Sequence, residues 1–522
     1  MHIAFLSNPA SGEVNVQLAT AQQLVFQGHS VTFLSAESCR GKVERFRMAQ
    51  QPGSQHRIRF ISLGSGRSVD DFTTYNQKRL HLMRRVPGDP ISLQTCTDTG
   101  LGPADEHART AMRVRDHINA LDPDMICIDV LTSPLVTGAR LTKRKFILTV
   151  PCSPGMTALS GAFEPHMVAA KRGGSWGTFF ENIYLNMHEL IHSRTHPDRR
   201  GKHKIIKCLG LKSYGASRDS AVLQPHWEDD NCVAGIHFNT PGLIDCPKQS
   251  SKMIFVGAGL SSESSPLAPA PTPTPTPTAP FPELAWMNEA ALLNQSVVYM
   301  NMGSMFIWQP HEFRACIEGF KAAHRHLSGR VRFLFKINTN STTTIPTSKE
   351  QQQVKDSLPP FIRLTNWIET QHAIYSHPAL KAFIHHGGGN SFNEAVHFAI
   401  PQLVLSQWLD THEYAGYAEK FGLGLRSTRP PYIDAGDIER KLLTLLGPRW
   451  PDFKASCRSW ALRSQLGGGV VAAAKVVLFH AETERAARAG NGNGTATRIE
   501  TELTPPLSPV QASTPLVDLM AG

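Results

Sequence analysis

A glycine-rich turn with polar neighbours is the part of the sequence best suited to chemistry. Residues 382–384 are typical of a short buried strand, three glycines follow at 387–389, and a helix carrying Glu394 comes next. Glycines let backbone amides approach an anion, and a helix start presents free N–H groups and the positive end of its dipole. The turn is therefore a candidate phosphate cradle. The same residues also suit an ordinary strand–turn–helix connection in which Asn390 or Ser391 caps the helix.

Further residues around the turn form a signature that resembles the donor-binding motif of family 1 glycosyltransferases, which transfer a sugar from a nucleotide diphosphate to a hydroxyl. The matching positions are Phe383, His386, Gly387, Gly388, Asn390, Ser391, Glu394, Pro401, Trp408 and Asp410. The resemblance implies that the donor diphosphate contacts His386, Gly388, Asn390 and Ser391. It also implies that Glu394 accepts hydrogen bonds from ribose hydroxyls and that Asp410, with Thr411, binds the hydroxyls of the donor sugar.

Three more donor contacts are implied by the resemblance. Ser304 matches a hydroxyl after the first strand of the donor-binding half, although it could equally cap a helix. Gln371 and Trp367 resemble the nucleobase-binding pair, but Trp367 lies one residue too far upstream and could instead be a core aromatic residue. Thr370 replaces the usual proline, and Thr411 replaces a usual glutamine. The common preference for UDP-glucose therefore does not carry over, and a purine such as guanine fits as well.

Sugar transfer also needs a base for the acceptor hydroxyl, and two acids near the N-terminus are candidates. Glu13 stands where plant-type members have a histidine and where related antibiotic and sterol glycosyltransferases have an aspartate. A carboxylate in a dry cleft has a raised pKa and can take a proton from an attacking hydroxyl. Asp129 matches the second residue of the catalytic dyad and would bind the acceptor or share a proton with Glu13. The alternative is that Glu13 merely complements a helix dipole.

No acidic pair of the DxD kind ends a strand in the second half of the chain. We therefore expect a helix start and neutral donors, rather than a metal ion, to meet the charge of the diphosphate. No other cofactor is expected, and the partners are a small-molecule donor and acceptor.

Several stretches outside the signature resemble a narrower family, the fungal erythritol mannosyltransferases, which transfer mannose from GDP-mannose to erythritol in glycolipid biosurfactant synthesis. These stretches are 12–16, 122–125, 150–154, 237–243, 301–306 and 405–414. The resemblance implies an inverting hexosyltransferase with that substrate pair. Two alternatives stay open: a UDP-glucose-dependent transferase acting on a lipid or secondary-metabolite hydroxyl, and a non-catalytic accessory protein that binds sugar nucleotides.

Short apolar runs separated by helix-length segments predict an α/β protein with two parallel sheets. Strands are expected at 2–6, 31–34, 58–61, 125–129 and 146–150, and then at 297–300, 331–337, 362–364 and 382–384. This pattern indicates two facing Rossmann-like, doubly wound domains of the GT-B type. The expected ranges are 1–260 for the acceptor domain, 261–282 for a Pro/Thr-rich linker, 283–483 for the donor domain and 484–522 for a disordered tail.

Composition argues against nucleic-acid binding and against membrane-spanning segments. The net charge of +10 is dispersed and lacks interleaved aromatic residues, which argues against nucleic acid. The basic stretch 194–207 is expected to be a solvated face. A strand directly after Met1 leaves no room for a secretory signal, and no apolar run reaches the roughly 20 residues of a bilayer span. Nine cysteines without a CxxC pair suit reduced thiols and a cytoplasmic location, while peripheral membrane contact stays compatible.

Overall fold

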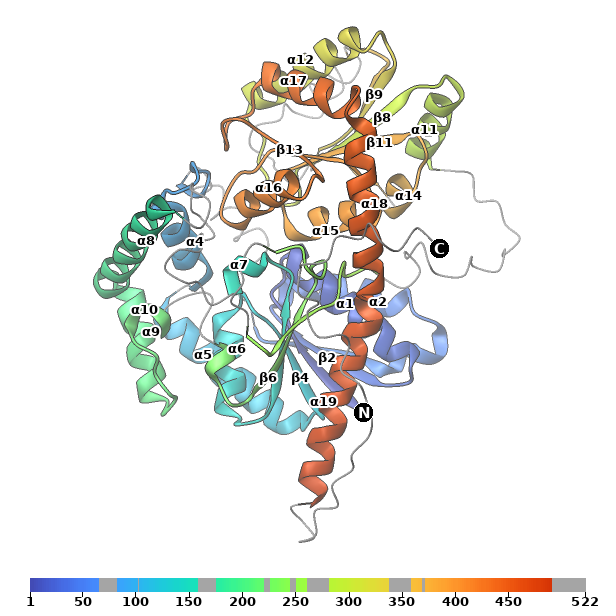
Figure 1. The fold of residues 1–522 in the computed structure, drawn as a ribbon. Coiled ribbons are helices and arrows are strands. Elements are labelled where there is room, and N and C mark those ends of the chain that lie inside the picture. The colour runs from blue at the N-terminus through green and yellow to red at the C-terminus, as the bar shows by residue number, and fades with distance from the viewer. Residues whose placement is uncertain are drawn as a thin grey trace, which may run out of the picture.

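Two parallel β-sheets, one above the other in Figure 1, organise the structure, which is a computed structural model. It describes residues 1–64, 82–101, 103–157, 175–219, 226–244, 250–260, 281–337, 358–368 and 371–490. The predicted fold class, two doubly wound α/β units, is confirmed. The predicted linker 261–282 lies almost wholly outside the described residues, as does the predicted tail beyond Gly490.

The first sheet has seven parallel strands in the order β3-β2-β1-β4-β5-β6-β7. Its strands are β1 (His2–Leu6), β2 (Ser30–Ser35), β3 (Ile58–Ser62), β4 (Met125–Asp129), β5 (Phe146–Val150), β6 (Cys232–His237) and β7 (Met253–Phe255). The main helices beside it are α1 (Ser11–Phe26), α2 (Arg40–Met48), α5 (Ala104–Leu121) and α6 (Ser133–Leu141). A group of outer helices comprises α4 (Pro90–Leu101), α8 (Trp176–Thr195), α9 (Pro197–Cys208) and α10 (Ala216–Asp219).

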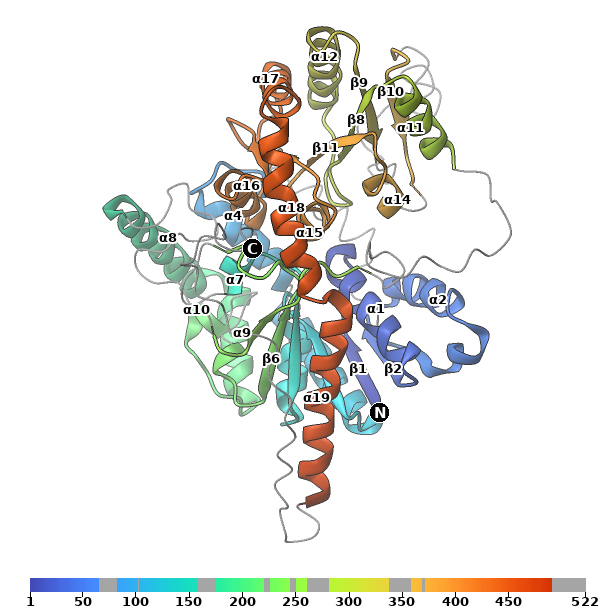
Figure 2. The same ribbon diagram turned by 45° about the vertical axis from the view of Figure 1, so that its right-hand side comes forward.

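The second sheet has six parallel strands in the order β10-β9-β8-β11-β12-β13. Its strands are β8 (Ser296–Asn301), β9 (Val331–Lys336), β10 (Ile362–Thr365), β11 (Leu380–His385), β12 (Gln402–Val404) and β13 (Gly424–Arg426). Its helices are α11 (Pro282–Leu292), α12 (Pro310–His326), α14 (Gln371–Tyr375), α15 (Gly389–His397), α16 (Asp410–Lys420), α17 (Ala435–Leu446) and α18 (Trp450–Leu466). The short helix α7 (Pro154–Thr157) lies between the two sheets in Figure 2.

Both sheets are covered on both faces, which explains why their strands are continuous apolar runs. Successive side chains of a strand point to opposite faces. In β1, Ile3 and Phe5 pack in one apolar cluster, whereas Ala4 and Leu6 pack in another. The strands therefore lack an alternating apolar and polar pattern, as is expected for a parallel sheet that is buried on both faces.

The last helix, α19 (Gly469–Gly490), returns from the second half of the chain to the first sheet. Its buried residues Val470, Ala473 and Val477 pack in the same cluster as Ile3 and Phe5, and Figures 1 and 2 show it running beside the lower sheet. The predicted range 283–483 assigned most of this helix to the second domain, and 484–490 to a disordered tail. The structure differs because the small, apolar face of α19 is buried against α1 and β4.

One helical stretch, Trp450–Ala489, is long and apolar enough to cross a membrane by length and composition alone. It combines α18 and α19, and no apolar run of that kind was expected from the sequence. Buried residues along it, such as Cys457 and Ala474, belong to apolar clusters of the fold. Packing against the two domains accounts for these buried residues, whereas Leu462, Leu466 and Phe479 of the same stretch are exposed.

Candidate active site

The candidate residues gather at the points where the strand order of each sheet reverses. In the first sheet, β1 lies between β2 and β4, and in the second sheet β8 lies between β9 and β11. In open parallel sheets, ligands bind beyond the carboxyl ends of the strands at such a point. Glu13 follows β1, Asp129 ends β4, Ser304 follows β8, and His386 follows β11. The hydrogen bonds from Asn390 to the Gly12 carbonyl and from the Ser153 amide to Asp410 bring the two ligand-binding edges together.

The two N-terminal acids form an electrostatically coupled pair. Asp129 is fully buried, and burial, followed by the charge of Glu13, raises its pKa. Its Oδ2 accepts a hydrogen bond from the Thr132 hydroxyl at 2.5 Å, and its Oδ1 accepts one from the Leu131 amide at 3.2 Å. Burial also raises the pKa of Glu13, whereas Lys42 opposes this shift. Two like charges cannot both be buried cheaply, so the pair holds a proton near neutral pH.

Glu13 has the freedom that a base requires. Its Oε2 is buried without a hydrogen-bond partner among the described residues. It lies in the first turn of α1, as the dipole alternative expects, but that alternative does not explain an orphaned buried oxygen. An acceptor hydroxyl is one group that would satisfy this oxygen. Catalysis by Glu13 and Asp129 stays a prediction.

The start of α15 is open to an anion. The residue before the helix is Gly388, and no side chain caps the helix. The expectation that Asn390 or Ser391 serves as a cap is therefore wrong for this helix start. The first-turn amides and the helix dipole remain directed at the cleft. Gly387, with φ of 90°, makes the turn that brings β11 into the helix.

His386 lines this turn as a neutral ring. Burial lowers its pKa to about 4, and its Nδ1 has no hydrogen-bond partner among the described residues. The centre of the His386 ring lies 5.6 Å from the centre of the Trp408 ring. The His386 ring also packs closely on Gly303, because a Cβ added at Gly303 would lie 2.5 Å from His386 Cε1. A neutral imidazole can still donate one N–H to a phosphate oxygen. Ser304, on the exposed bend after Gly303, is six residues before α12, so the alternative that it caps a helix is wrong.

Glu394 is held by a network centred on Gln371. The Gln371 amide nitrogen donates to Glu394 Oε2 at 3.2 Å and to the Tyr375 hydroxyl at 2.6 Å. Its oxygen accepts hydrogen bonds from Asn301 and Tyr299. Burial raises the pKa of Glu394 to about 7. The amide of Gln371 is thus engaged within the protein, where it orients the carboxylate expected to bind ribose.

Trp367 is a platform on the surface rather than part of the core. Its side chain is 72% exposed, so the core-aromatic alternative is wrong. The Lys336 ammonium lies 5.3 Å from the centre of its ring. Lys336 ends β9, and Glu394 acts on it electrostatically. An exposed indole beside the ribose-binding candidate is suited to stacking on a nucleobase.

Asp410 and Thr411 begin α16 but differ in availability. The Thr411 hydroxyl is buried and bonds to the backbone of Gln407 and Trp408, so it shapes the loop instead of facing the cleft. Asp410 follows Leu409, whose φ of 40° is a strained conformation for a bulky residue. Burial, followed by the charge of Glu13, raises the pKa of Asp410 to about 6.

The charge of Glu13 contributes to the raised pKa of Asp410, so the candidate acids of the two domains influence each other electrostatically. A direct contact also links the two domains, because the Asn390 side chain donates to the Gly12 carbonyl at 3.0 Å. The first turn of α15 and the first turn of α1 are therefore adjacent.

Sequence reasoning missed the residues that join the domains at this place. The Ser153 amide donates to Asp410 Oδ2 at 3.3 Å, and its hydroxyl donates to Glu413. Asn393 bonds to Thr240 and Asn239, and the Tyr414 hydroxyl donates to Asn239 at 2.7 Å. Lys42, which bonds to Ser11 Oγ at 3.0 Å, was missed too. The sequence signal that could have identified Ser153 and Asn239 is their position, because each follows a buried strand at the ligand-binding edge of the first sheet.

Comparisons with known proteins agree with this geometry. The family described as Erythromycin biosynthesis protein CIII-like, C-terminal domain, matches residues 337–456. Erythritol-mannosyl-transferase 1 of Pseudozyma antarctica (strain T-34) is 37% identical, with 93% of this chain and 92% of that protein covered. The protein of the same name from Mycosarcoma maydis is 38% identical, with 91% of each covered.

Solved structures share the fold at low sequence identity. The glycotransferase of kitacinnamycin has a TM-score of 0.60 at 16% identity, covering 92% of this chain and 98% of its own. Os79 from O. sativa has a TM-score of 0.59 at 16% identity, covering 92% and 100%. The fold and the two facing switch points define a glycosyltransferase of the GT-B type. Within this class, the chain belongs to the family of the fungal erythritol-mannosyl-transferases, so the predicted family and enzyme class are confirmed.

Proposed function

We propose that this chain is an inverting mannosyltransferase that moves mannose from GDP-mannose to erythritol in glycolipid synthesis. The observation that carries the mechanism is the placement of the Glu13–Asp129 pair opposite the uncapped start of α15, joined by the contact between Asn390 and Gly12. The names of the two fungal relatives support the sugar and the acceptor. Exposed Trp367, whose ring lies 5.3 Å from the Lys336 ammonium, supports a nucleotide donor.

In the proposed reaction, Glu13 takes the proton of the acceptor hydroxyl as its oxygen attacks C1 of the donor sugar. The bond from C1 to the diphosphate oxygen breaks with inversion, and the nucleoside diphosphate leaves with both electrons. The amides at Gly389–Ser391, together with His386, would stabilise its negative charge. Asp129 would share the proton with Glu13, and Asp410 would orient the sugar hydroxyls. In this proposal, neither the removal of the proton nor the departure of the nucleoside diphosphate requires a metal ion.

A donor-by-acceptor activity panel tests the assignment. GDP-mannose and UDP-glucose are each combined with erythritol and with a hydroxy fatty acid, with excess EDTA or with added Mg²⁺. The expected product is a β-mannoside of erythritol, identified by NMR at its anomeric carbon and formed at equal rates in both buffers. No product from GDP-mannose plus erythritol would remove the assignment. Product from UDP-glucose alone would favour the glucosyltransferase, and nucleotide binding without any product would favour the accessory protein.

We propose a cytoplasmic location and contact with an anionic membrane surface. The seven described cysteines at positions 39, 127, 152, 208, 232, 316 and 457 are all unpaired, which suits a reducing compartment. One face of α8 exposes an apolar stripe formed by Trp176, Phe180, Ile183, Tyr184, Met187 and Ile191. The neighbouring helix α9 exposes Arg200, Lys204 and Lys207. An apolar face near cations is suited to an anionic lipid surface.

Vesicle co-sedimentation tests this contact. We expect binding to vesicles containing an anionic phospholipid, weaker binding to zwitterionic vesicles, and loss of binding in Phe180→Ser. The matched control is Phe26→Ser, because Phe26 is an exposed phenylalanine on α1 outside the stripe. Equal binding of the two variants would contradict the proposal.

A further inference from the structure

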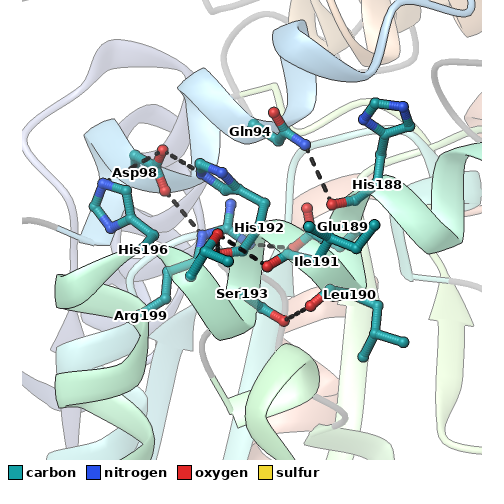
Figure 3. Close-up of polar contacts among 11 residues, drawn as sticks. Gln94, Asp98, His188, Glu189, Leu190, Ile191, His192, Ser193, His196 and Arg199 are labelled. Carbon is teal, nitrogen blue, oxygen red and sulfur yellow. Dashed lines mark hydrogen bonds and ion pairs between the residues drawn. The ribbon is translucent and has the colours of Figure 1, made fainter.

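Two histidines and an aspartate meet where α4, α8 and α9 come together, on helices that carry no candidate active-site residue (Figure 3). His192 Nε2 lies 2.8 Å from Asp98 Oδ2, and His196 Nε2 lies 3.9 Å from the same oxygen. All three potential ligand atoms lie within 4.8 Å of one another. Among the described residues, this is the group of acids, histidines and cysteines whose spacing would fit a metal ion.

The geometry suits a tetrahedral ion. Zinc bonds of about 2.0–2.1 Å at tetrahedral angles place ligand atoms roughly 3.3 Å apart. The two separations to Asp98 Oδ2, 2.8 and 3.9 Å, bracket that value, and the two histidine nitrogens lie within 4.8 Å of each other. His192 and His196 are four residues apart, which places two imidazoles on one side of a helix end. Imidazole with carboxylate is a ligand set for Zn²⁺ and similar transition metals rather than for Mg²⁺ or Ca²⁺.

The surrounding charges orient the carboxylate. Arg199 is fully buried, and its Nε donates to Asp98 Oδ1 at 2.8 Å, which leaves Oδ2 facing both histidine rings. Glu189 pairs with the other end of the same guanidinium. Two carboxylates and one guanidinium give a formal charge of −1 when the histidines are neutral. A cation is therefore attracted to the cluster despite the nearby arginine, and Arg199 acts as an outer partner that fixes the ligand.

A second observation concerns unsatisfied polar atoms in the same cluster. Three buried atoms have no hydrogen-bond partner among the described residues: His196 Nδ1, Glu189 Oε2 and Arg199 Nη2. Buried polar groups are normally paired, so these atoms point to water held at the cluster. Of the three, only the carboxylate oxygen of Glu189 could itself face a cation. The expectation from the sequence that 194–207 forms a solvated basic face holds for the exposed Arg200, Lys204 and Lys207. It fails for Arg199, which is buried beside its two acids.

We propose that Asp98, His192 and His196 bind one divalent transition-metal ion of the zinc class, with water in the fourth position. The ion would fasten α4 to the junction of α8 and α9, three helices that pack on one another. Its role is structural, because none of the three ligands belongs to the candidate active site. The site therefore stands independently of the proposed sugar transfer.

Metal titration of the full chain, stripped with a chelator and dialysed, tests the proposal directly. We expect saturable binding of about one Zn²⁺ per chain by calorimetry, a rise in melting temperature, and visible absorption typical of tetrahedral Co²⁺. In the double variant His192→Ala plus His196→Ala, the affinity should fall by more than about tenfold. His188→Ala is the matched control, since His188 is an exposed histidine one turn earlier on α8.

The measurement on the unmodified chain is decisive even where the double variant folds poorly. Absence of saturable Zn²⁺ and Co²⁺ binding would overturn the proposal and leave the cluster as a hydrogen-bonded network. Binding that persists unchanged in a folded double variant would overturn it as well. A loss of affinity in Asp98→Asn that exceeds the loss in His188→Ala would support it.

Discussion

The side-chain nitrogen of Asn390 donates a hydrogen bond to the carbonyl of Gly12 at 3.0 Å, across the cleft between the two sheets. Asn390 lies in the first turn of α15, and Gly12 precedes the candidate base Glu13 in the first turn of α1. The contact therefore fixes the place where the leaving group and the attacking hydroxyl would meet. In the proposed reaction each domain would supply one half of the machinery, the base from the first and the diphosphate site from the second.

Removal of the carboxylate from Glu13 should abolish chemistry while leaving donor binding intact. We expect Glu13→Gln to lower the turnover number by about 10²–10⁴-fold, the range typical of a lost general base. The affinity for the nucleotide should stay unchanged because the proposed donor site belongs to the other domain. Glu37→Gln, at an exposed acid after β2, is the control. Near-normal turnover in Glu13→Gln would dismiss Glu13 as the base.

Glu394 should cost stability above neutral pH. Burial raises its folded-state pKa to about 7 from the ordinary value of 4.5, so its charged form is disfavoured in the fold. The destabilisation is complete above pH 7 and disappears as the pH falls below 4.5. We expect Glu394→Gln to stabilise the protein by on the order of 1–3 kcal/mol at pH 8, and by little at pH 4.5, while raising the KM for the donor.

Thermal unfolding at the two pH values measures this effect. Glu318→Gln, at an exposed position of α12, is the control, and its effect on the melting temperature should be the same at both pH values. An identical shift of Glu394→Gln at pH 8 and pH 4.5 would show that its carboxyl group is not perturbed by burial.

Trp367 should contribute to donor affinity alone. We expect Trp367→Ala to weaken nucleotide binding by about 1–3 kcal/mol, the range for loss of one aromatic platform under a base. Trp367→Phe should retain most of the affinity, and the melting temperature should hardly change because the indole is exposed. Calorimetric titration with the nucleoside diphosphate provides the measurement. Unaltered affinity in Trp367→Ala would exclude stacking at this position.

Tyr414 should stabilise the contact between the domains. Its hydroxyl is fully buried and donates to Asn239, so Tyr414→Phe removes one hydrogen bond without leaving a large cavity. We expect a loss of about 1–2 kcal/mol in the free energy of unfolding. Tyr432→Phe, at a mostly exposed tyrosine, should be neutral. If both variants unfold at the same temperature, the buried network does not hold the domains together.

The sequence predicts the elements near the cleft well because their signals are local. Continuous apolar runs such as 2–6 and 125–129 read as buried parallel strands whatever lies around them. Glu13, Asp129 and His386 were named by their match to the glycosyltransferase pattern, and each lies just after or at the end of such a run. The exposure of Trp367 and the engaged hydroxyl of Thr411 could not be foreseen, because both depend on how a loop folds over its neighbours.

Long-range contacts lay beyond such reasoning. The Ser153 amide contacts a carboxylate that lies 257 residues further along the chain, and no periodicity records that pairing. The helical pattern of 469–490 is equally compatible with either sheet, so its return to β1 was missed. From the sequence alone, Arg199 is expected to be an exposed cation. Its ion pairs with Asp98 and Glu189 offset the cost of removing its charge from water.

A crystal structure of the metal-stripped protein with bound nucleoside diphosphate would show whether the start of α15 holds the diphosphate without a metal ion. We expect the terminal phosphate within hydrogen-bond distance of the amides at Gly389–Ser391 and of His386, with the base on Trp367 and no divalent ion between phosphate and protein. A diphosphate bound elsewhere, or bound at this helix start only through a metal ion, would contradict this expectation.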